Sequence, residues 1–181
     1  MKKNIEVKAV CADLERAEQI AYAIGATFQW RKRQSDIYWQ TPQGRLKLRL
    51  QEDDPAQLIA YRRSCEPRPR PSEYEIFITD QPQLLQGVLS NVLIQDIVVE
   101  KLRTLFLWKN IRIHLDQVRD IGTFIEFEAV IDHDSQQATQ DVEWLLQQFS
   151  ISPSFIIDKG YYELLKESKS ASQTQGFSRQ Q

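Results

Sequence analysis

Cysteine is scarce in this sequence. Cys11 and Cys65 are the only two among 181 residues, and their spacing matches neither a metal-binding nor a redox motif. We therefore expect a reduced and chemically inert pair, which argues against a disulfide framework, a cysteine-ligated metal site and a dithiol redox centre.

Long apolar runs are missing as well. No stretch approaches the ~18 apolar residues of a membrane-spanning helix. Met1-Lys2-Lys3 leads directly into a predicted strand, which leaves no room for the apolar part of a signal peptide. The formal net charge of −2 attracts neither nucleic acid nor an anionic membrane, and the sequence shows no aromatic platform for stacking bases. We expect a cytoplasmic protein, monomeric or homodimeric, without a membrane or nucleic-acid partner.

What is present is the composition of a globular protein. The chain is 41% hydrophobic and 27% charged, and it is long enough for one domain with its own core. We assign this single domain to residues 1–165. From 166 to 181 the composition turns to Ser, Gln and Lys without an apolar period, which predicts a disordered tail.

The most informative pattern is a charge at every second position. In a β-strand, residues i and i+2 point to the same face, roughly 6.6 Å apart. Arg45, Lys47 and Arg49 therefore form a row of like charge, which repels itself unless something negative lies along it. Acidic rows such as Glu126 and Glu128 occur on other predicted strands. The pattern indicates a surface that holds a polyanion and a cation together.

Helical and extended periodicities alternate along the chain. Asp13 can cap a helix that ends at Gly25, and Pro82 lies in the first turn of a second helix. Helices are predicted near 13–25, 80–92, 135–149 and 161–165. Strands are predicted near 4–10, 27–40, 45–51, 57–63, 72–78, 97–108, 111–118 and 122–131.

Two arrangements fit strands that alternate charged and apolar positions. In a sandwich, the apolar faces meet inside and the charges face water. In a closed barrel with a charged lumen, the apolar faces point outward, and the amphipathic helices would cover them. Eight strands would leave an interior just wide enough for side chains or one small ligand. The pattern alone leaves both arrangements open.

Several short motifs, in this order, resemble one known family. The motifs are Asn4-Ile5-Glu6-Val7-Lys8, Arg45-Leu46-Lys47-Leu48-Arg49, Tyr61-Arg62-Arg63, Lys101-Leu102-Arg103, Arg112-Ile113-His114-Leu115-Asp116 and Glu126-Phe127-Glu128, with a closing segment at 158–165. Together they resemble the CYTH family, also called triphosphate tunnel metalloenzymes, and within it most closely the bacterial class IV adenylate cyclase-like branch. The resemblance implies an α+β fold: an eight-stranded antiparallel β-barrel with a charged lumen and helices packed outside.

The resemblance also implies a site. A triphosphate would contact the basic residues Lys8, Arg45, Lys47, Arg49, Arg63, Lys101, Arg103 and Arg112, together with His114. Of these, Lys8, Arg49, Arg103 and Arg112 are the catalytic candidates, because arginine and lysine neutralise the charge that phosphoryl transfer develops. For His114, a structural role satisfied by its neighbours is an equal alternative.

The family binds Mg²⁺ or Mn²⁺, and oxygen-only ligands suit both cations. Candidate ligands are Glu6, Glu126 and Glu128, followed by Asp116, Glu73 and Glu75. One position departs from the family signature Glu-x-Glu-x-Lys, because its first Glu is Asn4 here. An amide oxygen can coordinate a hard cation but brings no charge, so this change puts metal affinity in question.

Three functions follow from this pattern. The leading hypothesis is a metal-dependent phosphohydrolase acting on inorganic triphosphate or a nucleoside triphosphate. The second is an adenylate cyclase that makes cyclic AMP and pyrophosphate from ATP, although the sequence shows no clear adenosine pocket. The third is a module that binds polyphosphate or nucleotide without turnover, since Asn4 weakens the metal site.

Overall fold

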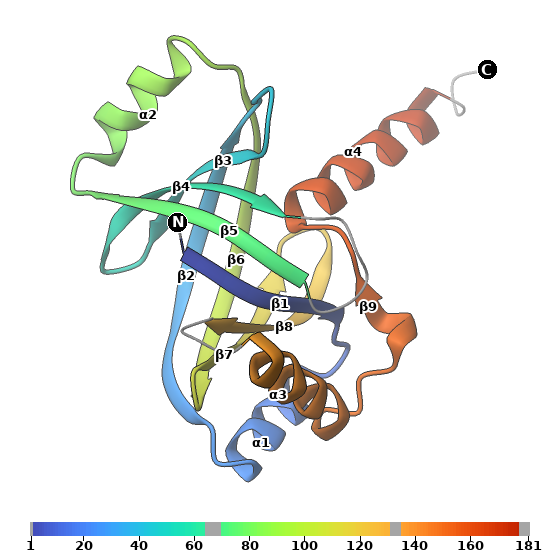
Figure 1. The fold of residues 1–181 in the computed structure, drawn as a ribbon. Helices are drawn as coiled ribbons and strands as arrows, with labels where there is room; N and C mark the ends of the chain where they lie inside the picture. Colours follow the sequence, from blue (N-terminus) through green and yellow to red (C-terminus); the bar gives the residue numbers. More distant parts are fainter. Residues whose placement is uncertain (1, 64–69, 131–134, 178–181) are drawn as a thin grey trace.

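A computed structural model describes residues 2–63, 70–130 and 135–177 (Figure 1). Its strands are β1 (Lys2–Val10), β2 (Thr27–Trp39), β3 (Arg45–Gln51), β4 (Asp54–Arg63), β5 (Arg70–Thr79), β6 (Gln95–Trp108), β7 (Ile111–Val118), β8 (Gly122–Val130) and β9 (Ile156–Ile157). Its helices are α1 (Leu14–Ala23), α2 (Pro82–Ser90), α3 (Ser135–Gln148) and α4 (Tyr161–Phe177), with a 3₁₀ turn at Pro153–Phe155. Within these ranges, every helix is too short or too polar to cross a bilayer.

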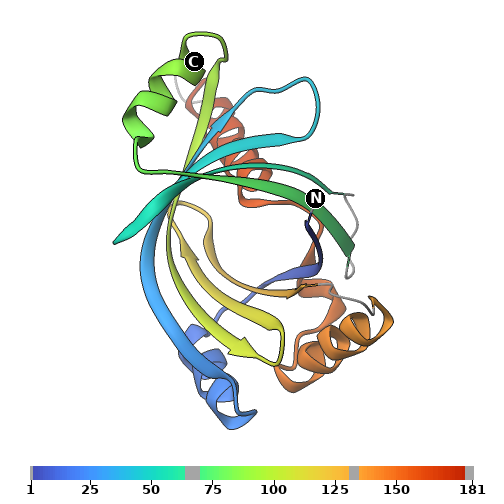
Figure 2. The same cartoon turned by 60° about the vertical axis from the view of Figure 1, so that its left-hand side comes forward.

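The strands close into a barrel. Hydrogen-bonded neighbours follow the order β5-β4-β3-β2-β6-β7-β8-β1-β9, and a further pairing of β5 with β1 closes the first eight of these strands. All neighbours are antiparallel, and at the seam Lys2 pairs with Tyr74 and Glu6 with Arg70. Figure 2 shows the strands curving into one wall with the helices outside it. The predicted α+β barrel is confirmed.

Strand alternation decides which face is inside. In β1, the side chains of Ile5, Val7 and Ala9 are buried on the outer face, in a core that also contains residues of α1 and α3. The intervening residues Glu6 and Lys8 line the interior. Because the apolar faces of the strands pack outward against helices, the sandwich alternative is excluded and the charged lumen is confirmed.

Two further apolar clusters hold α2 and α4. Trp39 and Leu48 of the barrel wall pack with Leu85 and Leu89 of α2. Val99 and Phe124 belong to a cluster with Tyr161, Tyr162 and Leu165 of α4. Val99 and Phe124 alternate in phase with the cavity residues Lys101 and Glu126, so α4 packs against the inner face of the strands at one end of the barrel. The rest of the interior is left to polar side chains.

The first helix forms as its sequence predicts. The side chain of Asp13 accepts a hydrogen bond from the backbone N–H of Arg16 at 2.9 Å, which satisfies one of the free donors in the first turn. Ala17 and Ala21 are buried one turn apart. Gly25 follows the helix with φ of +80°, a conformation that costs glycine little.

The last helix is longer than its apolar pattern predicts. α4 continues to Phe177 and so enters the segment for which we predicted a disordered tail, while 178–181 lie outside the described residues. Its first turns are anchored by buried Tyr161 and Leu165, and Lys166 contacts Asp96 at 2.9 Å. Once a turn is nucleated, each residue added to the helix forms one further hydrogen bond, so the helix can extend without an apolar stripe.

Candidate active site inside the barrel

The barrel encloses a cavity of about 410 Å³. All eight strands of the closed barrel contribute inward-facing side chains to its wall, and Gly160 and Tyr161 at the start of α4 complete it. Its basic lining residues are Lys8, Lys47, Arg49, Lys101, Arg103 and Arg112, and its acidic ones are Glu6, Asp36, Glu126 and Glu128. Charges of both signs are thus concentrated in a space of the size that small-molecule sites have.

Asp36 gathers three of the cations. Its carboxylate accepts from Arg49 Nε at 2.7 Å, from Lys101 Nζ at 2.8 Å and from Lys47 Nζ at 3.0 Å. Burial alone would raise the pKa of Asp36, but these three cations outweigh it and hold the pKa well below the usual range. Asp36 is therefore charged and is shared among all three. The only sequence signal for it was its alternation with Gln34 and Tyr38.

The two lysines of this group have pKa values close to neutral pH. Burial, opposed by Asp36, lowers the pKa of Lys101 to about 7. Burial and the nearby charge of Arg49 lower the pKa of Lys47 to about 8. Both therefore gain a proton readily when a further negative charge arrives.

Arg103 is held in one orientation by carboxylates. Its Nε and Nη2 donate to the two carboxylate oxygens of Asp116 at 2.7 and 2.5 Å, and Nη2 also donates to Glu126 at 3.0 Å. The phenol of Tyr161 donates to Asp116 at 2.7 Å. Asp116 is fully buried and does not line the cavity, whereas Arg103 does. Asp116 thus serves to aim a guanidinium inward, and Arg103 in turn holds its pKa far below the usual range despite burial.

Lys8 lies next to this group. Its ammonium contacts Glu126 at 2.7 Å and lies 3.9 Å from the centre of the Tyr161 ring. Burial is the main reason that the pKa of Lys8 is lowered, and Glu126 opposes the effect. Tyr161 is both packed in a cluster and part of the cavity wall.

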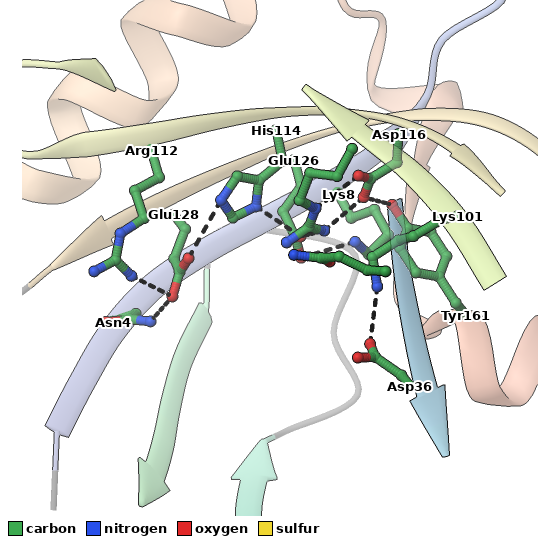
Figure 3. Close-up of polar contacts among 12 residues, drawn as sticks. Asn4, Lys8, Asp36, Lys101, Arg112, His114, Asp116, Glu126, Glu128 and Tyr161 are labelled. Carbon is green, nitrogen blue, oxygen red and sulfur yellow. Dashed lines mark hydrogen bonds and ion pairs between the residues drawn. The ribbon is translucent and has the colours of Figure 1, made fainter. Parts of the chain in front are cut away.

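The other part of the site is organised around Glu128 (Figure 3). Arg112 Nη1 lies 3.3 Å from Glu128, and the amide nitrogen of Asn4 donates to the same carboxylate. His114 lies between two carboxylates, with Nδ1 3.2 Å from Glu126 and Nε2 3.8 Å from Glu128. Burial, followed by the charge of Arg103, lowers the pKa of His114.

Some predicted residues lie elsewhere. Glu73 and Glu75 alternate with Ser72, Tyr74 and Ile76, and only the latter three line the cavity. Glu73 and Glu75 therefore lie on the other face of β5, away from the residues that line the cavity, because a Glu-x-Glu string looks the same whichever face of a strand it occupies.

Two of the predicted phosphate contacts also differ from expectation. Arg45 is at the edge of the site, where it donates to Glu163 of α4 at 2.6 Å and lies 4.8 Å from the Tyr162 ring centre. It is not among the residues of the cavity wall. The side chain of Arg63 lies outside the described part of the chain.

The donor set suits a hard divalent cation. Glu6 and Glu128 face each other in the β1–β8 register, and both line the cavity. The amide oxygen of Asn4 is buried and has no hydrogen-bond partner in the described part of the chain, which leaves it available as a ligand. Three acidic or histidine side chains do not converge on one point within the described ranges. Mg²⁺ in proteins is usually bound by one or two carboxylates, and waters and phosphate oxygens complete its ligand set.

Comparison with known proteins identifies the family to which this barrel belongs. A model of the CYTH domain matches residues 2–159, and the chain belongs to the CYTH domain family. Comparison with curated proteins gave no match.

Solved structures share the fold. The PH1012 protein of Pyrococcus horikoshii superposes with a TM-score of 0.81 at 20% identity, covering 91% of this chain and 99% of that one. A Vibrio parahaemolyticus protein described as a candidate adenylate cyclase gives 0.75 at 21% identity, covering 90% and 97%. A Hippeastrum protein described as a candidate adenylyl cyclase with a dominant triphosphatase activity gives 0.62 at 15% identity, covering 88% and 91%. At these identities the likeness establishes the fold alone.

Proposed function

We propose that this protein is a divalent-metal-dependent phosphohydrolase that cleaves inorganic triphosphate or a nucleoside triphosphate. The observation that carries the proposal is the enclosed cavity with six basic side chains on its wall. A triphosphate has about four negative charges, and its hydrolysis requires their neutralisation more than it requires covalent chemistry. Membership of the CYTH family and the triphosphatase activity described for the Hippeastrum relative support it.

The arginines and lysines of the cavity have different roles in binding the phosphates. Arg103, aimed inward by Asp116, and Arg49, held by Asp36, offer guanidinium groups that bind phosphate oxygens with two donors. Lys101 and Lys47 lie beside Arg49 and become fully charged as the anion enters. Because these groups are ordered before the substrate binds, little reorganisation is needed as charge spreads in the transition state.

Glu6, Glu128 and the amide oxygen of Asn4 would hold the divalent cation, which when bound neutralises and polarises phosphoryl oxygens. His114 lies beside these residues, and its Nδ1 is bonded to Glu126. A water oriented there attacks phosphorus, the bond to the bridging oxygen breaks, and the released proton passes to Nε2 of His114. This assigns His114 a part in catalysis in addition to its structural contacts.

Adenylate cyclase is the second candidate, and one observation favours it. Trp30 and Leu105 face each other in the β2–β6 register, and both line the cavity together with Tyr74. They form an apolar part of the wall on which a nucleobase could stack. ATP is therefore a reasonable substrate for either reaction.

The test is a product analysis. Purified protein is incubated with Mg²⁺ or Mn²⁺ and either triphosphate or ATP, and phosphate, pyrophosphate and cyclic AMP are measured. Phosphate without cyclic AMP supports hydrolysis. Pyrophosphate in equal amount to cyclic AMP identifies a cyclase, and tight binding without turnover identifies a binding module.

A matched pair of variants tests the assigned site. Glu128→Gln should abolish turnover, because the carboxylate assigned to the cation is lost while its volume is kept. Glu75→Gln removes the same charge from the outer face of β5 and should leave turnover unchanged. Equal activity of the two variants would refute the assignment of Glu128.

A further inference from the structure

β5 extends beyond the strand that closes the barrel against it. Its pairing with β1 ends where Tyr74 meets Lys2, whereas its pairing with β4 continues to Thr79 opposite Ala56. From Glu75 to Thr79, β5 thus has β4 on one side and no strand of the described ranges on the other. Figure 1 shows β5 continuing past the start of β1 towards α2. Such an edge presents N–H and C=O groups that can pair with another strand.

The side chains of this edge are apolar on both faces. Phe77 on the outer face is 61% exposed, and Ile78 on the opposite face is 62% exposed. Natural edges are usually protected by lysine, proline or a very short strand. This stretch, Glu75 to Thr79, has none of these devices.

An apolar groove runs alongside the edge. It lies between the end of β5 and α2, has a volume of about 630 Å³, and is lined by Pro55, Phe77, Ile78, Leu84 and Val88 among others. Leu84 and Val88 are one helical turn apart and are 63% and 55% exposed. Whatever pairs with the edge therefore also finds apolar surface to cover.

We propose that the edge Glu75–Thr79 pairs antiparallel with the same edge of a second copy, which makes the protein a two-fold symmetric homodimer. A symmetric register centred on Phe77 places Glu75 opposite Thr79 and Ile76 opposite Ile78 of the other copy. It brings apolar residues together and sets no like charges opposite each other, which would be unfavourable across two strands. One surface that matches itself is what a two-fold interface requires.

Length also favours a second copy over an unrelated strand. The open edge of each copy has five residues, Glu75 to Thr79, and it would be filled by the same five residues of the other. Directly after this segment β5 ends and the chain turns into α2, so the segment offered by the second copy is no longer than the open edge.

The mass of the full-length protein in solution is the first measurement. Light scattering after size-exclusion chromatography should give twice the 21.2 kDa of one chain. Phe77→Lys should reduce the mass to that of a monomer, because it places two ammonium groups on the symmetry axis. Phe155→Lys changes a comparably exposed aromatic residue outside the edge and groove, and it should leave the dimer intact.

A cysteine experiment tests the register. In a background with Cys11→Ser and Cys65→Ser, Phe77→Cys should form a disulfide-linked dimer on oxidation, since both copies of residue 77 meet at the axis within disulfide reach. Thr79→Cys should not cross-link, because residue 79 lies opposite Glu75 and far from its own copy. Ile78→Lys provides a second disrupting variant if Phe77→Lys does not fold.

Three outcomes would overturn the proposal. They are a monomeric wild-type protein across a concentration series, a dimer that survives both Phe77→Lys and Ile78→Lys, and cross-linking that is equal at residues 77 and 79. Slow hydrogen exchange at 75–79 in a monomer would show that another part of the chain covers the edge. None of these results depends on the enzymatic activity.

Discussion

Asp36 provides the sharpest test of how the cavity is built. This carboxylate is 1% exposed and accepts hydrogen bonds from Arg49, Lys101 and Lys47. Asp36→Asn keeps its size, removes its charge, and turns one acceptor oxygen into a donor that faces cations. Removing one partner from a buried charge group usually costs about 3–5 kcal/mol, because the remaining charges are left without compensation. For a protein of this length, that cost corresponds to a fall of about 6–20 °C in the unfolding temperature.

The pH dependence of this loss has a definite sign. The pKa of Lys101 in the folded protein is about 7, below its value of 10.5 in an unfolded chain, so the unfolded state binds more protons between these values. Without Asp36 this pKa falls further. Above about pH 7, Lys101 is neutral in both proteins and its contribution to the difference is constant. Below pH 7, Lys101 binds a proton in folded wild type but not in the folded variant. The stability difference between the two proteins therefore grows as the pH falls.

Thermal unfolding followed by circular dichroism at pH 6 and pH 8 measures both effects. Asp54→Asn is the control, because Asp54 bonds Lys32 and Gln51 at the surface, where such pairs contribute at most about 1 kcal/mol. Added triphosphate should stabilise Asp36→Asn more than wild type, since its oxygens replace the missing anion. An Asp36→Asn protein that unfolds within the range of the Asp54→Asn control would refute the idea that Asp36 neutralises the cluster.

Three further predictions follow from the site. ATP binding at pH 8 should take up fewer protons in Lys101→Arg than in wild type, as measured by calorimetry in buffers of different ionisation enthalpy; equal uptake would show that Lys101 is already charged. Asn4→Glu should increase the affinity for Mg²⁺ or Mn²⁺ and lower stability without metal, because it adds a carboxylate beside Glu128. Unfolding temperatures measured across a metal titration report both effects, and an unchanged affinity would show that the amide is not a weakened ligand. Arg103→Lys should lower kcat on the order of 10²-fold, because the two-donor grip on phosphate is lost; steady-state kinetics with an unchanged kcat would remove Arg103 from the machinery.

The barrel was predictable because its strands share one pattern. Alternation in β1, where Glu6 and Lys8 lie between Ile5, Val7 and Ala9, demands one polar and one apolar face. Which face was inside remained open in the residues themselves and was settled by where α1, α2 and α3 pack. The length of α4 was missed because its outer turns lie beyond the apolar contacts that define a helical stripe.

The site was predictable on strands that carry rows of charge and less so elsewhere. Lys47 and Arg49 line the cavity together with Arg103, as their spacing indicates. Asp36 was missed because no other charged residue of β2 lines the cavity beside it, so its strand carries no row of charge. Its partners lie on β3 and β6. Glu75 was misplaced because local alternation fixes the period of a strand but not its phase, which depends on pairing with β4.

The internal carboxylates give the cavity a preference for ligands with several charges. Asp36 and Glu126 form ion pairs with the cations around them, so the protein itself balances much of the charge of the lumen. An anion must compete with these carboxylates for the same donors. A single phosphate has too few oxygens to take up the donors of both the Asp36 group and the Arg103 group. The triphosphate that we propose as substrate has more oxygens and more charge, so we expect it to gain more from the two groups. Specificity then arises from the cost of displacing the internal anions as well as from attraction to the cations.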